Sequence, residues 1–158
     1  MDVDRIPRPL ELALSGEGFR RHRRLAIPLA TPDPDGCPRV ALLTFGEVRV
    51  VSPHQVAVAV LAGSRTAANL IRRRRGTLIV LQRGMAAYVQ ARAGRGRVSP
   101  SLPERQIFPL TVIRVRVDSP GPDEGEVELL GGPTFTRRGA EALFSGELFE
   151  ELGLGFPH

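Results

Sequence analysis

The chain has 158 residues, 42% of them apolar, and a formal net charge of +5, and this length predicts one globular domain over residues 1–158. All 22 basic residues are arginines, and the absence of lysine excludes Schiff-base chemistry, including that of pyridoxal phosphate. The single cysteine, Cys37, excludes an internal disulfide and a multi-cysteine zinc site, and the three histidines lack metal-ligand spacing, so we expect no metal centre.

The first half of the chain predicts a short helix, three β-strands and a second helix. The first helix is expected at 9–14, and the strands at 24–31, at 38–51 with Gly46 as a candidate break, and at 55–62. Asp35-Gly36 lies between the first two apolar runs, a pattern typical of a hairpin turn. Gly63 ends the third strand and Ser64 is a natural N-cap, so we expect the second helix at 65–74.

The second half predicts four more strands and a final helix. The strands are expected at 76–82, 85–94, 109–118 and 125–131, with the longest loop at 99–109. Thr136 is a candidate cap for a helix over about 136–152, which carries an apolar stripe, contains Gly146 as a candidate bend and ends near Gly153. Several short strands with one intervening helix favour a mainly β protein, and in particular a barrel.

The start of the second helix has the composition of an anion site. Ser64, Arg65 and Thr66 combine two hydroxyls, a guanidinium and free backbone N–H groups at the positive end of a helix dipole, which suits a phosphate. The alternative is an ordinary serine N-cap beside a solvated arginine. Because the chain has no lysine, arginine must supply the charge at any phosphate site.

The order and spacing of these motifs resemble the pyridoxamine 5′-phosphate oxidase-like FMN-binding split-barrel family over roughly residues 25–94. The matching segments are Asp35-Gly36-Cys37-Pro38-Arg39-Val40, Ser64-Arg65-Thr66-Ala67-Ala68-Asn69-Leu70, the arginines at 72–75 and the strand at 77–81. The resemblance implies a split β-barrel that forms a homodimer and binds FMN in clefts between the subunits, with the phosphate near residues 64–66. Many relatives carry a lysine where Thr66 stands, which leaves the charge to Arg65 or another arginine.

The resemblance also implies further cofactor-binding residues. The strand with Arg39, Val40, Ala41 and Leu42 would lie along the flavin ring and ribityl chain and use mainly main-chain groups; the alternative is a half-buried strand with Arg39 pointing outward. Asn69 would contact the cofactor or hold the neighbouring loop.

A later strand of the predicted barrel adds two polar candidates. Gln90 and Arg92 alternate with apolar neighbours, so that they would either face the cofactor of a partner subunit or lie on the surface. No catalytic residue is legible, and the late His and Arg pattern of true pyridoxamine phosphate oxidases is absent.

We therefore expect an FMN-dependent oxidoreductase of unknown substrate, with a reduced nicotinamide as a candidate electron donor. A non-catalytic flavin binder and a deazaflavin or haem binder of the same fold remain open. The basic runs at 20–24 and 72–75 favour nucleic-acid binding as the alternative function, although a chain with one tyrosine and no tryptophan has few side chains for base stacking. No apolar run reaches the roughly 18 residues of a membrane helix, and aspartates occupy an N-terminus that would be basic in a signal peptide, so we expect a cytoplasmic protein.

Overall fold

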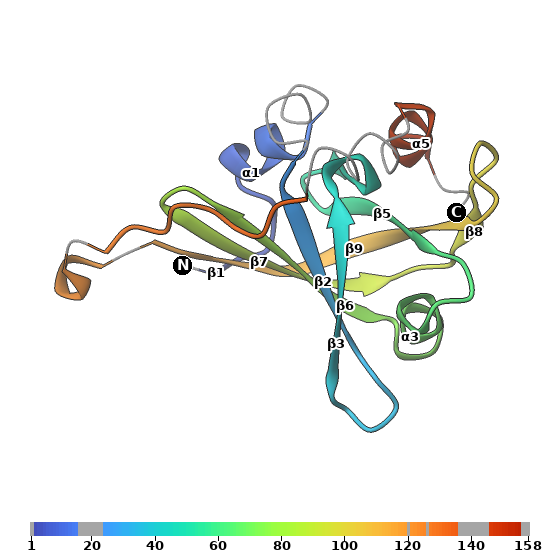
Figure 1. Ribbon diagram of the computed structural model, residues 1–158, viewed down its shortest axis with the longest axis horizontal. Helices are drawn as coiled ribbons and strands as arrows, with labels where there is room; N and C mark the ends of the chain where they lie inside the picture. The colour runs from blue at the N-terminus through green and yellow to red at the C-terminus, as the bar shows by residue number, and fades with distance from the viewer. Residues whose placement is uncertain (1, 16–23, 120, 126, 136–145, 156–158) are drawn as a thin grey trace.

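A computed structural model describes residues 2–15, 24–119, 121–125, 127–135 and 146–155 (Figure 1). The described part is mainly β and forms a split barrel from one antiparallel sheet. The strands are β1 (Asp2–Val3), β2 (Ala26–Pro32), β3 (Pro38–Thr44), β4 (Val48–Ser52), β5 (Gln55–Leu61), β6 (Arg75–Gln82), β7 (Met85–Ala93), β8 (Arg97–Val98) and β9 (Arg105–Asp118). The helices are α1 (Arg8–Ala13), α3 (Arg65–Arg73) and α5 (Gly146–Leu152), with short 3-10 turns η1 (Phe45–Glu47) and η2 (Pro122–Glu124).

The strand order is β3-β2-β6-β7-β9-β5-β4, and β1 and β8 also pair with β9. Strand β9 is long enough to serve two partners in succession, since its first half pairs with β5 and its second half with β7. In Figure 1 the helices α1 and α5 lie on one side of the sheet, while α3 lies on the other side near the β2–β3 hairpin. Strand β3 ends the order, so one of its edges has no strand partner among the described residues.

The β2–β3 hairpin forms where the Asp35-Gly36 turn predicts it. Gly36 has φ 87°, a left-handed conformation that glycine adopts without the steric cost of a Cβ atom. The turn is closed by hydrogen bonds from Gly36 N–H to the Asp33 carbonyl (2.8 Å) and from Cys37 N–H to Asp35 Oδ1 (3.0 Å). Consecutive residues of β2 and β3 then pair in unbroken register from Pro32 and Pro38 down to Ala26 and Thr44.

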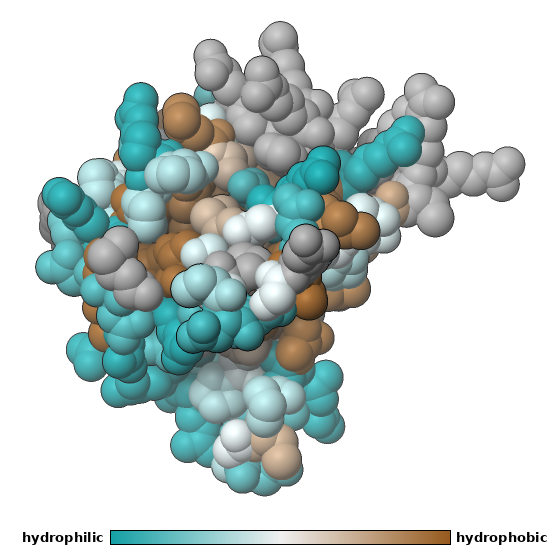
Figure 2. Space-filling view, turned by 90° about the vertical axis from the view of Figure 1, so that its left-hand side faces the viewer, coloured by the Kyte–Doolittle hydropathy of each residue, from teal (hydrophilic) through white to brown (hydrophobic). Residues whose placement is uncertain are grey.

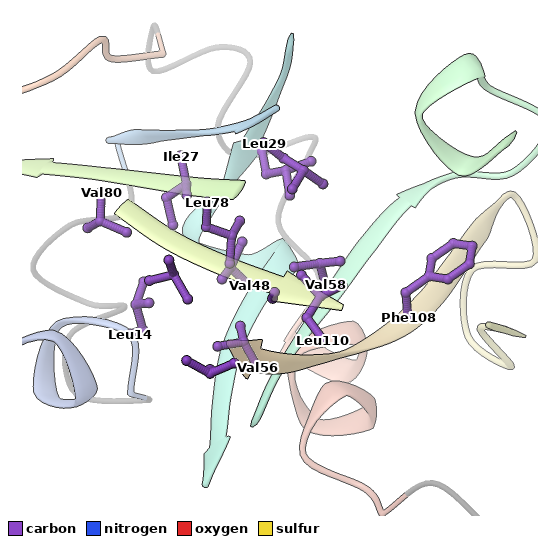
Figure 3. Close-up of a cluster of buried hydrophobic side chains, with 14 of the residues drawn as sticks. Leu14, Ile27, Leu29, Val48, Val56, Val58, Leu78, Val80, Phe108 and Leu110 are labelled. Atoms are coloured by element: carbon purple, nitrogen blue, oxygen red, sulfur yellow. The ribbon is translucent and has the colours of Figure 1, made fainter. Parts of the chain in front are cut away.

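The main core fills the space enclosed by the sheet. Leu14 enters from the end of α1 and points toward side chains of the sheet strands, among them Ile27, Val56 and Val80 (Figure 3). A second, smaller cluster packs Leu148, Phe149 and Leu152 of α5 against Ala57, Ala59 and Ile107 on the opposite side of β5 and β9. Seen from the side, hydrophilic side chains cover much of the surface, with apolar patches between them (Figure 2). Among the described residues no helix is long and apolar enough to cross a membrane.

One predicted strand break is confirmed, and two predicted strands need correction. The strand expected at 38–51 breaks at η1, which contains the candidate break Gly46, and there Glu47 Oε1 accepts hydrogen bonds from Thr44 N–H and Oγ (both 3.0 Å), which closes a capping box. The strand expected at 109–118 begins at Arg105, so the loop that starts at 99 is shorter than predicted. No strand forms over the described residues of 125–131, where glycines and Pro133 follow and the contacts are isolated, such as Gly84 N–H to the Leu129 carbonyl at 2.8 Å.

Both predicted outer helices are only partly matched. The N-terminal helix begins at Arg8 rather than at Pro9 and ends at Ala13. Of the helix expected over about 136–152, residues 136–145 lie outside the described residues, and Gly146–Leu152 is helical as α5. The two-residue strands β1 and β8 were not predicted, because so short a segment carries no periodicity of its own and forms only by pairing with β9.

Candidate functional site

The N-terminus of α3 presents polar groups that its own structure leaves available. Ser64 caps the helix, since its Oγ accepts the Ala67 N–H at 3.1 Å, and the same hydroxyl retains a proton to donate. The backbone N–H groups of Arg65 and Thr66 make no hydrogen bond within the described part of the chain, as is usual in a first helical turn. The Arg65 side chain is exposed and Thr66 is buried. An anion placed here would meet two N–H donors, a hydroxyl and a guanidinium.

Asn69 ties α3 to the β2–β3 hairpin. Its Nδ2 donates to Thr31 Oγ1 (3.1 Å) and to Asp33 Oδ1 (2.8 Å), and its side chain is buried with 4% of the residue exposed. Arg39 Nε donates to both oxygens of Asp33 (3.0 and 3.2 Å). Asn69 therefore holds the neighbouring hairpin, which is the role that the sequence left open beside cofactor contact, and Arg39 is paired rather than free.

The Asp33 carboxylate accepts hydrogen bonds from both Asn69 and Arg39, and we call the contact that joins α3 to the hairpin the Asp33–Asn69 clamp. The hydrogen bond from Asn69, the bond from Arg39 and the positive charges of Arg39 and Arg65 lower its pKa below the ordinary value of 3.8, against a smaller opposing effect of burial. Asp33 is thus ionised at neutral pH. Arg65 lies near enough to feel this charge without forming an ion pair with it.

The strand β3 distributes the candidate residues over both faces of the hairpin. Side chains alternate along a strand, and Ala41 packs against the main core while Val40 and Leu42 are 56% and 52% exposed on the other face. Arg39 shares the face of Ala41, because it lies opposite Thr31, the partner of Asn69. The side chains of Arg39, Ala41 and the α3 residues therefore lie on one face, and those of Val40 and Leu42 on the other.

Gln90 belongs to the second of these faces. Register places Val40 opposite Ala30, Ala30 opposite Thr77 and Thr77 opposite Gln90, so that these side chains form one row across four strands. This row borders an open groove of about 360 Å³. The groove is lined mainly by residues of β2, β6, β7 and β9, including Thr31, Pro38, Arg75, Thr77, Gln90 and Arg114.

Arg114 is a groove residue that the sequence did not reveal. Its Nε and Nη2 donate to Gln90 Oε1 at 3.2 and 3.1 Å, so the two side chains act together. The partner strands β7 and β9 are separated by many residues, and only their register brings this pair together. Asp33 was missed for the same reason, since its partner Asn69 lies 36 residues away. The alternation of polar and apolar residues in β9 was the only available signal for Arg114.

The remaining polar candidates lie apart from both regions. Arg92 is exposed on β7 opposite Arg75 and does not line the groove with Gln90. Cys37 is exposed in the hairpin, and His54 Nδ1 lies 3.2 Å from the Asp4 carbonyl oxygen. Within the described ranges no group of three His, Cys, Asp or Glu side chains is arranged to hold a metal ion.

Comparison with known proteins supports the fold and leaves the chemistry open. No protein-family model and no curated protein sequence matches the chain significantly. Solved structures similar to it include a proposed pyridoxamine 5′-phosphate oxidase from Lactobacillus delbrueckii (TM-score 0.54, 17% identity, 72% of this chain and 95% of that one). They also include an F420 reductase (0.55, 14%, 70% and 98%) and an FMN-binding protein from Syntrophomonas wolfei (0.53, 13%, 70% and 88%). The chain has the pyridoxamine 5′-phosphate oxidase-like split-barrel fold that these proteins share.

Proposed function

We propose that this protein binds FMN and works as a flavin-dependent oxidoreductase. The observation that carries the proposal is the N-terminus of α3, which brings together in consecutive residues the Ser64 hydroxyl, the exposed Arg65 side chain, and the N–H groups of Arg65 and Thr66 that make no bond within the described chain. This donor set fits a phosphate dianion. One of the similar structures is an FMN-binding protein, so the same fold accommodates this ligand in that protein.

The rest of the cofactor would follow the hairpin. The edge of β3 that has no strand partner among the described residues would offer main-chain N–H and C=O groups to the ribityl chain and ring, and β3 contacts α3. Asp33 and Asn69 would hold the hairpin at a fixed position relative to the phosphate site. Val40 and Leu42 expose apolar side chains on the outer face of β3, and a second copy of the chain is the partner that we propose to cover them in a homodimer.

When bound, FMN supplies the redox chemistry, accepting electrons from a reduced nicotinamide or another donor. The contribution of the polypeptide would be to bind the phosphate, orient the ring and limit access of water. A cytoplasmic location, where reduced nicotinamides are available, forms part of the proposal. A deazaflavin is the second candidate ligand, favoured by the similarity to an F420 reductase.

The test compares FMN binding by the wild type and by Arg65→Ala, with quenching of flavin fluorescence as the measure of binding. Loss of a charge-assisted pair should weaken FMN binding by about 1.5–3 kcal/mol, or roughly tenfold to a hundredfold. Riboflavin, which has no phosphate, should bind wild type and variant alike. Arg72→Gln, an exposed substitution on the same helix, is the matched control and should leave both affinities unchanged.

Three outcomes contradict the proposal. Equal loss of FMN and riboflavin binding would mean that Arg65 supports the fold rather than the phosphate. Unchanged FMN binding would remove Arg65 from the site. A wild-type protein that binds neither flavin nor deazaflavin, while binding single-stranded DNA with one preferred sequence at physiological salt, would replace the flavoprotein proposal with the nucleic-acid one.

A further inference from the structure

The opposite end of α3 carries a pocket whose lining, among the described residues, consists of arginines. Arg73, Arg74, Arg75 and Arg92 surround a volume of about 270 Å³, and all are exposed. None of them forms an ion pair with an acidic side chain among the described residues. The pocket therefore concentrates positive charge that the described chain itself does not balance.

Two of these arginines have a structural explanation. Arg73 lies in the last turn of α3 and Arg74 is its C-cap, where cations interact favourably with the helix dipole. Arg73 Nη2 donates to the Pro34 carbonyl at 2.8 Å, and Arg74 Nε donates to the Ala93 carbonyl at 3.3 Å. These bonds hold both side chains at the pocket.

The other two have no such explanation. Arg75 on β6 and Arg92 on β7 lie directly opposite each other in the ladder, and like charges in that position destabilise a sheet. Neither side chain makes a hydrogen bond or an ion pair within the described ranges. A bound anion would turn this repulsion into attraction to a common ligand.

We propose that this arginine pocket binds the diphosphate group of a small phosphorylated ligand. Planar guanidinium groups bind phosphate oxygens in pairs. A single phosphate carries about −1.5 to −2 charges at pH 7 and would leave roughly half of the positive charge unbalanced, whereas a diphosphate balances most of it. Arg75 also lines the groove beside Gln90, so the pocket opens next to that groove.

This pocket is separate from the proposed FMN phosphate site and does not depend on it. Helix α3 has 9 residues, which at a rise of about 1.5 Å per residue places its two ends roughly 13 Å apart. One phosphate group cannot occupy both ends. Substitutions at one end should therefore leave the other site intact.

The experiment is calorimetric titration with inorganic diphosphate, with ionic strength held constant by sodium chloride. We expect one site in the wild type and about tenfold weaker binding in both Arg75→Gln and Arg92→Gln. Arg83→Gln removes an exposed arginine that is paired with Glu128 outside the pocket, and it should bind as the wild type does. Arg65→Ala should also retain diphosphate binding.

Thermal unfolding adds a readout that a merely structural role would not produce. Because Arg92→Gln removes a repulsive cross-strand pair, it should raise the Tm of the ligand-free protein while reducing the rise in Tm caused by diphosphate. Titrations with ADP and adenosine show whether the diphosphate group belongs to a nucleotide or is the free anion. ADP binding at least as tight as that of inorganic diphosphate, with none for adenosine, indicates a nucleotide, and weaker ADP binding indicates the free anion.

Several results would overturn the proposal. If Arg92→Gln bound diphosphate with wild-type affinity, the pocket would not be the binding site. If Arg83→Gln lost as much diphosphate affinity as Arg92→Gln, the effect would come from net charge alone. Loss of diphosphate binding in Arg65→Ala would place the anion at the other end of α3. Tight binding of single-stranded DNA that Arg92→Gln abolishes, without diphosphate binding, would assign the pocket to a nucleic acid.

Discussion

The two ends of helix α3 treat positive charge in opposite ways. At the N-terminal end Asp33 accepts bonds from Arg39 and Asn69 and lies within the electrostatic reach of Arg65, so acid and base are interleaved. At the C-terminal end, arginines of the helix meet arginines of β6 and β7. The hairpin contacts both the middle and the end of α3, with the Asp33 carboxylate bonded to Asn69 and the Pro34 carbonyl bonded to Arg73. Only at the C-terminal end does the β6–β7 ladder add further guanidinium groups. Charge balance in this protein is therefore set by pairing between segments rather than along the helix.

The largest expected loss of stability comes from truncating Leu70, the buried side chain that anchors α3 to the sheet. Leu70 is fully buried between α3 and the sheet, beside Gly76. Leu70→Ala should lower the free energy of unfolding by about 2–5 kcal/mol, since the site loses apolar contacts and keeps a cavity. The next residue, Ile71, is 56% exposed, and Ile71→Ala should change stability by less than about 0.5 kcal/mol. Denaturation in urea measures both, and equal losses would show that α3 is not anchored through Leu70.

A smaller loss is expected from releasing only the N-terminal end. Asn69→Ala removes the donor to Thr31 and Asp33, and the unfolding free energy should fall by about 1–3 kcal/mol because the buried Thr31 hydroxyl loses its donor, while Asp33 keeps only its bonds from Arg39. Arg72→Ala, exposed on the same helix, serves as the control. Hydrogen exchange should accelerate in the hairpin and the first turn of α3. Uniform acceleration across β7 and β9 would instead indicate global destabilisation.

Acid should weaken the N-terminal end and leave the arginine end unchanged. The folded pKa of Asp33 lies below its unfolded value, near 3.8, owing first to the Asn69 hydrogen bond and then to Arg39. Its stabilising contribution is therefore present above that unfolded value and is lost as pH falls through the lower, folded pKa. The stability difference between wild type and Asp33→Asn should shrink below about pH 4. A difference that stays constant to lower pH would mean that the Asp33 charge contributes nothing.

The smallest expected effect is at the C-terminal end of α3, where a substitution should raise stability instead of lowering it. Arg74 has φ 54° and ψ 34°, a left-handed conformation that costs a non-glycine residue roughly 1 kcal/mol. Arg74→Gly should raise the Tm slightly, because relief of this cost outweighs the loss of a long bond to Ala93. Arg73→Gly, one position earlier in the helix, should lower stability by about 1 kcal/mol. Loss of stability in both variants would show that the Arg74 side chain contributes more than its backbone costs.

Local chemistry in the sequence was sufficient for the elements that depend on near neighbours. The Asp35-Gly36 turn and the Ser64 cap form as predicted, because each is stabilised by hydrogen bonds between atoms a few residues apart. Strands β5, β6 and β7 also lie close to where their apolar patterns predict them, although their pairing partners include strands far along the chain. The available groups at Ser64, Arg65 and Thr66 belong to this class, since a helix N-terminus carries its unpaired N–H groups wherever the helix packs.

Pairing between distant segments decided the rest. Residues 105–109 are strand rather than loop because β5 offers them a partner, and the described part of 125–131 finds none that would make it a strand. The Asp33–Asn69 clamp, the Arg114–Gln90 pair and the opposition of Arg75 and Arg92 likewise depend on strand register and on the docking of α3. For strands not joined by a tight turn, a sequence read segment by segment contains no information on register, because register is then selected by the packing of the whole sheet against its core.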